Sequence, residues 1–220
     1  MDAATIETNV RRILDELPEH VTLVAAGKMR TPEEQLAAAA AGVTVIGHNY
    51  VQQAEAARAA VGDRVRWHLI GHLQRNKAKK AVELFDMVES LDSERLARAL
   101  DKAAAKAGRV LPVLIEVNSG EEQSKDGIMP DAVEGLARQL AAVEHLDLQG
   151  LMTMGPYDPD PERMRPYFRK TRELFDMLAA ADIPGVQMRW LSMGMSDSFR
   201  VAIEEGANLV RIGSALFGPR

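Results

Sequence analysis

The amino-acid sequence predicts a (β/α)8 TIM-type barrel with an extra N-terminal helix. Apolar runs typical of strands alternate with helical patterns along the chain, which indicates a parallel α/β architecture. Eight such runs occur within 220 residues, and no G-x-G-x-x-G motif follows the first of them, so a closed barrel fits better than a doubly wound sheet. The continuously apolar run 113–115 is typical of strands buried on both faces.

The order of the elements supports this prediction. Apolar residues recur at helical spacing from Ile6 to Leu17, so the chain begins with a helix. Strands are predicted at 21–26, 44–47, 65–70, 87–91, 111–117, 146–153, 188–193 and 209–212. Helices are predicted at 32–41, 50–61, 75–84, 93–107, 130–143, 160–181 and 197–205. Because no linker, repeat or low-complexity tract separates these elements, we predict one domain over residues 1–220.

Several predicted helices have recognisable ends. Thr31-Pro32-Glu33-Glu34 places an N-cap, a proline at the first helical position and a capping-box glutamate in order. Asp160-Pro161 repeats the cap and the proline. Gly42 and Gly206 stand where helices should stop.

The composition excludes several classes of protein. A net charge of −5 argues against a nucleic-acid binder, which would usually carry a basic face. The absence of cysteine excludes disulfides, thiol catalysis and cysteine-bound metal. The N-terminus lacks the pattern of a secretory signal, and the alanine run 37–41 is too short to span a bilayer. We therefore expect a soluble cytoplasmic protein with neither nucleic-acid nor membrane partners.

Groups suited to chemistry follow the first strand and the last two. Lys28 ends the first strand, and the turns 192–196 and 211–214 follow the seventh and eighth. The carboxyl ends of barrel strands meet at one mouth, and the loops after strands seven and eight commonly bind phosphate. Ser196 offers a hydroxyl and backbone N–H groups, and Gly213-Ser214 lets a phosphate approach the backbone. An amine facing a phosphate cradle suits an aldehyde-bearing phosphate cofactor, which makes pyridoxal phosphate the leading hypothesis.

Other polar residues leave alternatives open. Arg211 stands in an apolar strand, where a guanidinium is costly unless it meets a ligand or an acid; both interpretations remain. His48, His68 and His72 follow or flank strand ends without clustered acids, so we predict no metal site.

A set of short segments spread over essentially the whole chain carries a family resemblance. The segments are Leu23-Val-Ala25 leading to Lys28, Gly47-His-Asn-Tyr-Val-Gln52, Trp67-His-Leu-Ile-Gly71, Leu73-Gln74, Asn76-Lys77, Lys125-Asp-Gly127, Gly150-Leu-Met152, Leu191-Ser-Met-Gly-Met-Ser-Asp197 and Val210-Arg-Ile-Gly-Ser-Ala-Leu-Phe-Gly218. Taken in order, this set resembles the pyridoxal phosphate homeostasis protein family, single-domain relatives of the alanine racemase barrel.

The resemblance implies a site and a role. It implies pyridoxal 5'-phosphate held as an internal aldimine on Lys28, with the phosphate at Ser196, Gly213 and Ser214. It also implies Arg211 near the pyridine nitrogen and Asn49 beside the ring. The family is regarded as a monomeric cofactor carrier or homeostasis factor, whose partners would be recipient apo-enzymes. No residue is assigned a catalytic role.

Three positions depart from the pattern of the family. His48 replaces a glutamate, Gly27 replaces a hydroxyl residue before the lysine, and Ser198 replaces a second aspartate. These departures leave the proposed Schiff base and phosphate cradle intact. A role that depends on an acid at position 48, such as lysine exchange or a polar gate, is not expected.

Two other functions remain as alternatives. The first is a weak pyridoxal-phosphate-dependent amino-acid racemase that uses His48 or His68 as its second acid–base group. An efficient racemase is not expected, because the chain ends at Arg220, directly after the barrel, without the second domain of racemases. The second alternative is a barrel that binds another phosphate ester, with Lys28 only as a charge partner.

Overall fold

The eight predicted strands form a closed parallel barrel. The structure, a computed structural model, describes residues 1–156 and 158–219. The strands are β1 (Thr22–Ala26), β2 (Val45–His48), β3 (Arg66–Leu69), β4 (Met87–Leu91), β5 (Leu111–Glu116), β6 (Leu146–Met152), β7 (Trp190–Ser192) and β8 (Leu209–Ile212). Each strand pairs in parallel with its neighbour in the sequence, and β8 pairs with β1 to close the ring. The predicted (β/α)8 TIM-type barrel is therefore confirmed.

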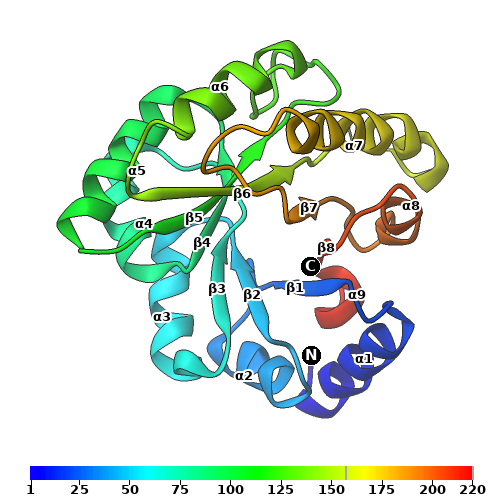
Figure 1. Cartoon of the computed structure of the whole chain (residues 1–220). Coiled ribbons are helices and arrows are strands. Elements are labelled where there is room, and N and C mark those ends of the chain that lie inside the picture. Colours follow the sequence, from blue (N-terminus) through cyan, green and yellow to red (C-terminus); the bar gives the residue numbers. More distant parts are fainter. Residues whose placement is uncertain (157, 220) are drawn as a thin grey trace.

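Helices surround the barrel (Figure 1). They are α1 (Ala3–Glu16), α2 (Pro32–Ala40), α3 (Val51–Val61), α4 (Ala78–Leu84), α5 (Glu94–Lys106), α6 (Val133–Leu140), α7 (Arg165–Ala180), α8 (Phe199–Glu204) and α9 (Ser214–Phe217). Short 3-10 turns cover Gly62–Arg64, Arg75–Lys77, Pro130–Ala132 and Pro161–Met164. No helix among the described residues is long and apolar enough to cross a membrane.

The extra N-terminal helix completes the outer ring. The helix after β8, α9, has four residues, so it covers little of the barrel. Helix α1 packs against both α9 and α2, and in Figure 1 it lies in the ring between α8 and α2. Its buried face, Ile6, Val10 and Ile13, repeats at the predicted helical spacing.

The predicted helix ends are confirmed at the positions where capping chemistry is strongest. Thr31 Oγ accepts the Glu34 N–H, and the Glu34 carboxylate accepts the Thr31 N–H, which is a complete capping box. Gly42 and Gly206, with φ of +113° and +95°, follow α2 and α8. Helix α8 begins at Phe199, two residues later than predicted, and α9 was not predicted.

Apolar side chains form one core outside the barrel and another inside it. The outer core lies between strands and helices and includes the largest buried side chains, Trp67, Phe85, Phe168, Phe199 and Phe217. The inner core is a smaller cluster of Val24, Val45, Ile70, Met87, Leu114, Met152 and Leu209. Strand alternation thus sends one set of side chains to the helices and the other to the barrel axis.

Polar residues follow the inner apolar cluster along the same faces of their strands. Glu89 stands two residues after Met87, and Arg211 stands two after Leu209, so both face the barrel interior. The same step of two residues continues beyond β1, from Ala26 to Lys28. Polar side chains therefore lie at the carboxyl ends of the strands, next to the inner apolar cluster.

Candidate functional site

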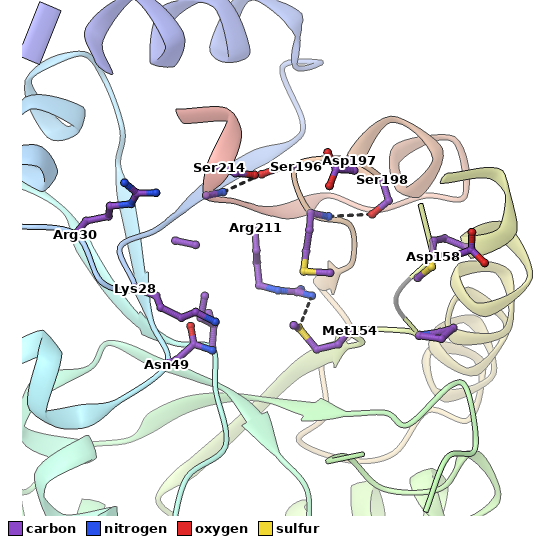
Figure 2. Close-up of a pocket in the computed structure, with 16 residues that line it drawn as sticks. Lys28, Arg30, Asn49, Met154, Asp158, Ser196, Asp197, Ser198, Arg211 and Ser214 are labelled. Carbon is purple, nitrogen blue, oxygen red and sulfur yellow. Dashed lines mark hydrogen bonds between the residues drawn. The ribbon is translucent and has the colours of Figure 1, made fainter. Parts of the chain in front are cut away.

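A cavity of about 300 Å³ opens at the carboxyl ends of the strands. All of the residues predicted to form a binding site line it: Lys28, Asn49, Ser196, Arg211, Gly213 and Ser214. In Figure 2 the Lys28 side chain extends into the cavity toward Asn49 and Arg211, while Ser196 and Ser214 lie together on another wall. The loops after four different strands thus converge on one space.

A tight turn presents Lys28. The Arg30 N–H donates to the Gly27 carbonyl oxygen at 3.1 Å, which closes a β-turn with Lys28 and Met29 at its centre. Met29 has φ of +59°, a left-handed conformation that a non-glycine residue adopts at a cost. The Arg30 guanidinium then donates to the Gly218 carbonyl at 2.6 Å and lies over the Phe217 ring. The Arg30 end of the turn is therefore fixed against the residues that follow β8.

A buried glutamine on α2 connects this turn to His48. Gln35 Nε2 donates to the carbonyl oxygens of Gly27 and Arg30, at 3.4 and 3.1 Å. Its amide oxygen therefore faces His48 Nε2, which lies 2.9 Å away. Because an amide oxygen can only accept a hydrogen bond, His48 Nε2 carries the proton and donates it. A Cβ on Gly27 would lie 2.8 Å from Gln35 Oε1. A glycine before Lys28 therefore leaves the space that the Gln35 side chain occupies between the turn and His48.

His48 lies behind the site rather than in it. Its ring is buried and stacks on Trp67 in the outer core, with ring centroids 5.9 Å apart. Its Nδ1 is buried and has no hydrogen-bond partner among the described residues. A proton there would be desolvated without an acceptor, and burial lowers the pKa of His48 to about 4. His48 is therefore a neutral positioning group.

Gly71 leaves room for the backbone of Asn49. A Cβ on Gly71, just after β3, would lie 2.7 Å from both the Cα and the carbonyl oxygen of Asn49. A side chain at position 71 would therefore displace the backbone that carries Asn49.

The late turns supply unsatisfied backbone donors. Ser196 Oγ accepts the N–H groups of Gly213 and Ala215, at 3.2 and 3.3 Å, and so joins the two turns. The N–H groups of Ser196, Asp197 and Ser214 donate no hydrogen bond within the described part of the chain. All three residues line the cavity, so this wall is suited to an anion.

Ser198 fulfils a structural role in the same turn. Its Oγ accepts the Met195 N–H at 3.2 Å, and the Met195 carbonyl accepts the N–H groups of Ser198 and Phe199. The departure from a second aspartate at this position therefore leaves the turn closed. The turn also explains why α8 starts at Phe199, since residues 195–198 form the turn and precede the helix.

Arg211 lines the cavity and is linked to an acid through Ser192, so neither of the two alternatives for this residue excludes the other. It donates to the Thr153 carbonyl at 2.7 Å and to Ser192 Oγ. Ser192 Oγ in turn donates to Glu89 Oε2 at 2.6 Å, and Glu89 Oε1 lies 2.7 Å from His68 Nδ1. The guanidinium is thus connected to a buried carboxylate across the barrel.

The charges of this network depend on one another. Burial alone would raise the pKa of Glu89, but His68, Arg211 and Ser192 stabilise the carboxylate and hold its pKa below the usual value. Burial lowers the pKa of Arg211, and the nearby Glu89 and Glu116 oppose that shift. An ionised Glu89 is therefore the buried counter-ion of Arg211.

Sequence reasoning missed Gln35, Glu89 and Glu116. Each is a polar residue at a buried position of an apolar element. The signal for the two glutamates was their spacing, two residues beyond inward-facing Met87 and Leu114. The sequence offered no signal that Gln35, on an alanine-rich helix, faces inward.

The barrel belongs to the class of the alanine racemase N-terminal domain. The sequence profile of the alanine racemase N-terminal domain matches residues 1–220. Alanine racemase of Corynebacterium glutamicum shares the fold, with a TM-score of 0.79 at 17% identity over 100% of this chain and 62% of that one.

Closer relatives specify the family. A pyridoxal phosphate homeostasis protein of Aquifex aeolicus is 43% identical over 90% of this chain and 86% of its own length. The protein of the same name from Pasteurella multocida is 36% identical over 99% and 95%. PipY of Synechococcus elongatus, solved with PLP bound, has a TM-score of 0.89 at 33% identity, covering 97% of this chain and 100% of that one. The chain belongs to the pyridoxal phosphate homeostasis protein family.

Proposed function

We propose that this chain binds pyridoxal 5'-phosphate in the described cavity, as an internal aldimine on Lys28, and acts in cofactor homeostasis or delivery. The observation that carries the proposal is the convergence of the lysine and an anion-binding wall on one cavity of about 300 Å³. The PLP-bound PipY structure and the names of the relatives support the choice of cofactor. The predicted monomeric state and cytoplasmic location are part of this proposal.

The backbone donors of the late turns would hold the phosphate. The N–H groups of Ser196, Asp197 and Ser214 need acceptors, and a phosphate supplies several. Gly213 lines the cavity, and the lack of a side chain there leaves the backbone of this wall accessible. No additional basic side chain is required for this role.

Arg211 would tune the bound cofactor. A guanidinium near the pyridine nitrogen favours an unprotonated ring, because two adjacent positive groups repel each other. An unprotonated ring is a weak electron sink, which restrains carbanion chemistry. This property suits a carrier better than a transaminase.

The racemase alternative gains no support from either histidine. His48 faces the outer core, and His68 is buried against Glu89. Neither is among the described residues that line the cavity. An acid–base group opposite Lys28 would therefore have to come from another residue.

The test is an absorbance spectrum of the purified protein with pyridoxal phosphate, followed by borohydride reduction and peptide mass mapping. An imine band that reduces to a stable adduct on Lys28 is the expected result. Lys28→Ala should abolish the adduct, while Lys79→Ala, at an exposed position on α4, serves as the matched control.

Two outcomes would count against the proposal. An adduct that maps to another lysine would reject the role of Lys28. The absence of both band and adduct in the intact protein would reject the cofactor, and a different phosphate ester bound by the same wall would become the working hypothesis.

A further inference from the structure

Arg30 contacts both sides of the cavity at the carboxyl ends of the strands. Its backbone N–H closes the turn that presents Lys28, and its side chain reaches the residues that follow β8. The residue also lines the cavity, and in Figure 2 it lies on the same side as Lys28. The proposed function gives this residue no role.

Three contacts hold the guanidinium of Arg30. Nη2 donates to the Gly218 carbonyl oxygen at 2.6 Å, Nη1 lies 3.8 Å from Glu34 Oε1, and Cζ lies 5.6 Å from the centroid of the Phe217 ring. The side chains of Arg30 and Glu34 are 13% and 12% exposed, so water and salt screen these contacts weakly. A charge-assisted hydrogen bond combined with stacking on a ring fixes the orientation of a planar guanidinium.

The far end of this link is the short helix α9. The helix begins at Ser214, has four residues and is capped by Gly218, so it is only about 6 Å long. Ser214 lines the cavity, and its N–H belongs to the anion-binding wall that it forms with Ser196 and Asp197. Arg30 therefore holds one end of a helix whose other end is part of that wall.

The near end of the link is the turn itself. Lys28 and Met29 occupy its centre, and Met29 has a left-handed backbone with φ of +59°. A non-glycine residue keeps such a conformation only where the surrounding structure holds it. Gln35 binds the turn from α2, and Arg30 joins it to the residues after β8. The Arg30 side chain thus connects the Lys28 turn to α9 beyond the ends of the paired strands β1 and β8.

The contacts of Arg30 favour positioning over direct binding of an anion. Its guanidinium faces a carbonyl oxygen and the carboxylate of Glu34, which compensates its charge. The anion-binding wall consists of backbone N–H groups on the turns after β7 and β8. The two roles predict different effects on the binding of free phosphate, so phosphate affinity separates them.

We propose that Arg30 is a positioning residue that fixes the Lys28 turn at one distance from the anion-binding wall, and so makes the cavity selective for phosphorylated aldehydes. This inference rests on the proposed function, in which Lys28 and the wall bind two different groups of one cofactor. A ligand with both groups gains affinity from binding them together only if the two halves of the site are correctly spaced. An aldehyde without a phosphate, or a phosphate without an aldehyde, gains nothing from the spacing.

Three probes measure the two halves of the site and their combination. Inorganic phosphate, titrated calorimetrically into the cofactor-free protein, reports the wall. Deoxypyridoxal, which has the aldehyde but no phosphate, reports Lys28 by the absorbance of the imine, whose formation releases one water. Pyridoxal phosphate reports both halves at once. In Arg30→Ala, the affinities for phosphate and deoxypyridoxal should stay within about threefold of the native values, and the affinity for pyridoxal phosphate should fall about tenfold or more.

Two further variants make the result specific. Arg30→Lys keeps the charge but lacks the planar group that stacks on Phe217, so its affinity for pyridoxal phosphate should also fall, by about fivefold or more. Arg200→Ala is the matched control, because Arg200 also stacks on a phenylalanine and pairs with a glutamate, but does not line the described cavity. It should leave all three affinities unchanged. Urea unfolding verifies that each variant is folded.

Specific results would overturn the positioning role. An equal loss of affinity for inorganic phosphate and for pyridoxal phosphate in Arg30→Ala would show that Arg30 contacts the anion itself. Native affinity in Arg30→Lys would show that the charge of the residue matters and its geometry does not. An unchanged preference for pyridoxal phosphate over deoxypyridoxal in Arg30→Ala would reject the coupling of the two halves.

Failure of the proposed function has a different signature. The native protein would then form no imine on Lys28 with either aldehyde, and the positioning role would be rejected with it. Failure of this inference alone would show as a normal imine on Lys28, with equal affinities for pyridoxal phosphate in the native protein and in Arg30→Ala.

Discussion

Gly27 and His48 depend on each other for space. A Cβ on Gly27 would lie 3.1 Å from His48 Nε2 and closer still to Gln35, which joins the two. The two positions that flank the site are therefore joined in one packing arrangement. Gln35 faces His48 and occupies the volume that a side chain at position 27 would need.

Gly27→Ala should destabilise the fold and disturb the turn that carries Lys28. The added methyl group must displace a buried amide held by three hydrogen bonds, at a cost of about 1–3 kcal/mol. Urea unfolding measures this cost. Gly135→Ala, on α6 with open space around its Cβ, is the matched control and should stabilise by about 0.5–1 kcal/mol.

A double-mutant cycle with Gln35→Ala tests the reason for that cost. Removing the Gln35 amide should relieve most of the strain from the methyl group at position 27, giving a coupling above about 0.5 kcal/mol. Strictly additive costs would contradict the shared-space interpretation.

His48→Gln should make the protein more resistant to acid. The pKa of His48 is about 4 in the folded protein and 6.5 in the unfolded chain, so the unfolded chain binds the extra proton first. Stability attributable to neutral His48 is therefore present above pH 6.5 and lost as the pH falls toward 4, by on the order of 3 kcal/mol. Glutamine keeps a donor for Gln35 and does not titrate.

Unfolding curves at several pH values measure the difference between this variant and the native protein. His20→Gln, at an exposed position, controls for the removal of a histidine. Parallel pH profiles for native protein and His48→Gln would contradict the assigned neutral state.

Arg211→Met should be severely destabilising. It removes the guanidinium that is linked through Ser192 to the buried carboxylate of Glu89, which then retains only His68 and Ser192, and breaking a buried charge pair typically costs about 3–5 kcal/mol. Adding Glu89→Gln should recover part of the loss, because the amide carries no charge. Arg138→Met, which breaks an exposed pair with Glu134, should cost less than about 1 kcal/mol in the same assay.

Glu116→Gln should stabilise the protein at alkaline pH. The pKa of Glu116 is about 7 when folded and 4.5 in the unfolded chain, so the native protein loses stability as the pH rises from 4.5 through 7. The full cost, on the order of 3 kcal/mol, is present above pH 7. The variant should lack this loss; a native-like pH profile in the variant would contradict an unpartnered carboxyl.

Every second side chain along a strand points to the same face, and this periodicity made most of the site predictable. Lys28 continues the inward face of β1, and Arg211 and Gly213 continue that of β8, so their meeting at one mouth follows from a closed parallel barrel. Ser196 was predicted from its place in a turn after β7, and the cavity includes it. Their roles toward a cofactor stay predictions.

The remaining parts of the site depend on contacts between distant elements. Glu89 gains its role from Ser192, which is 103 residues away and meets it across the barrel. Gln35 lies in a helix whose alanines on all sides conceal which face is buried. Helix α9 is too short for helical periodicity to register in the sequence.

The interior ion network also sets how the protein would respond to salt. The positive charge of Arg211 is matched by buried carboxylates, and the anion-binding wall consists of backbone dipoles rather than surface cations. Added electrolyte screens exposed charges within about 10 Å and reaches such an interior poorly. An anion would thus be retained with nearly constant affinity over ionic strengths that dissociate ligands from basic surface patches.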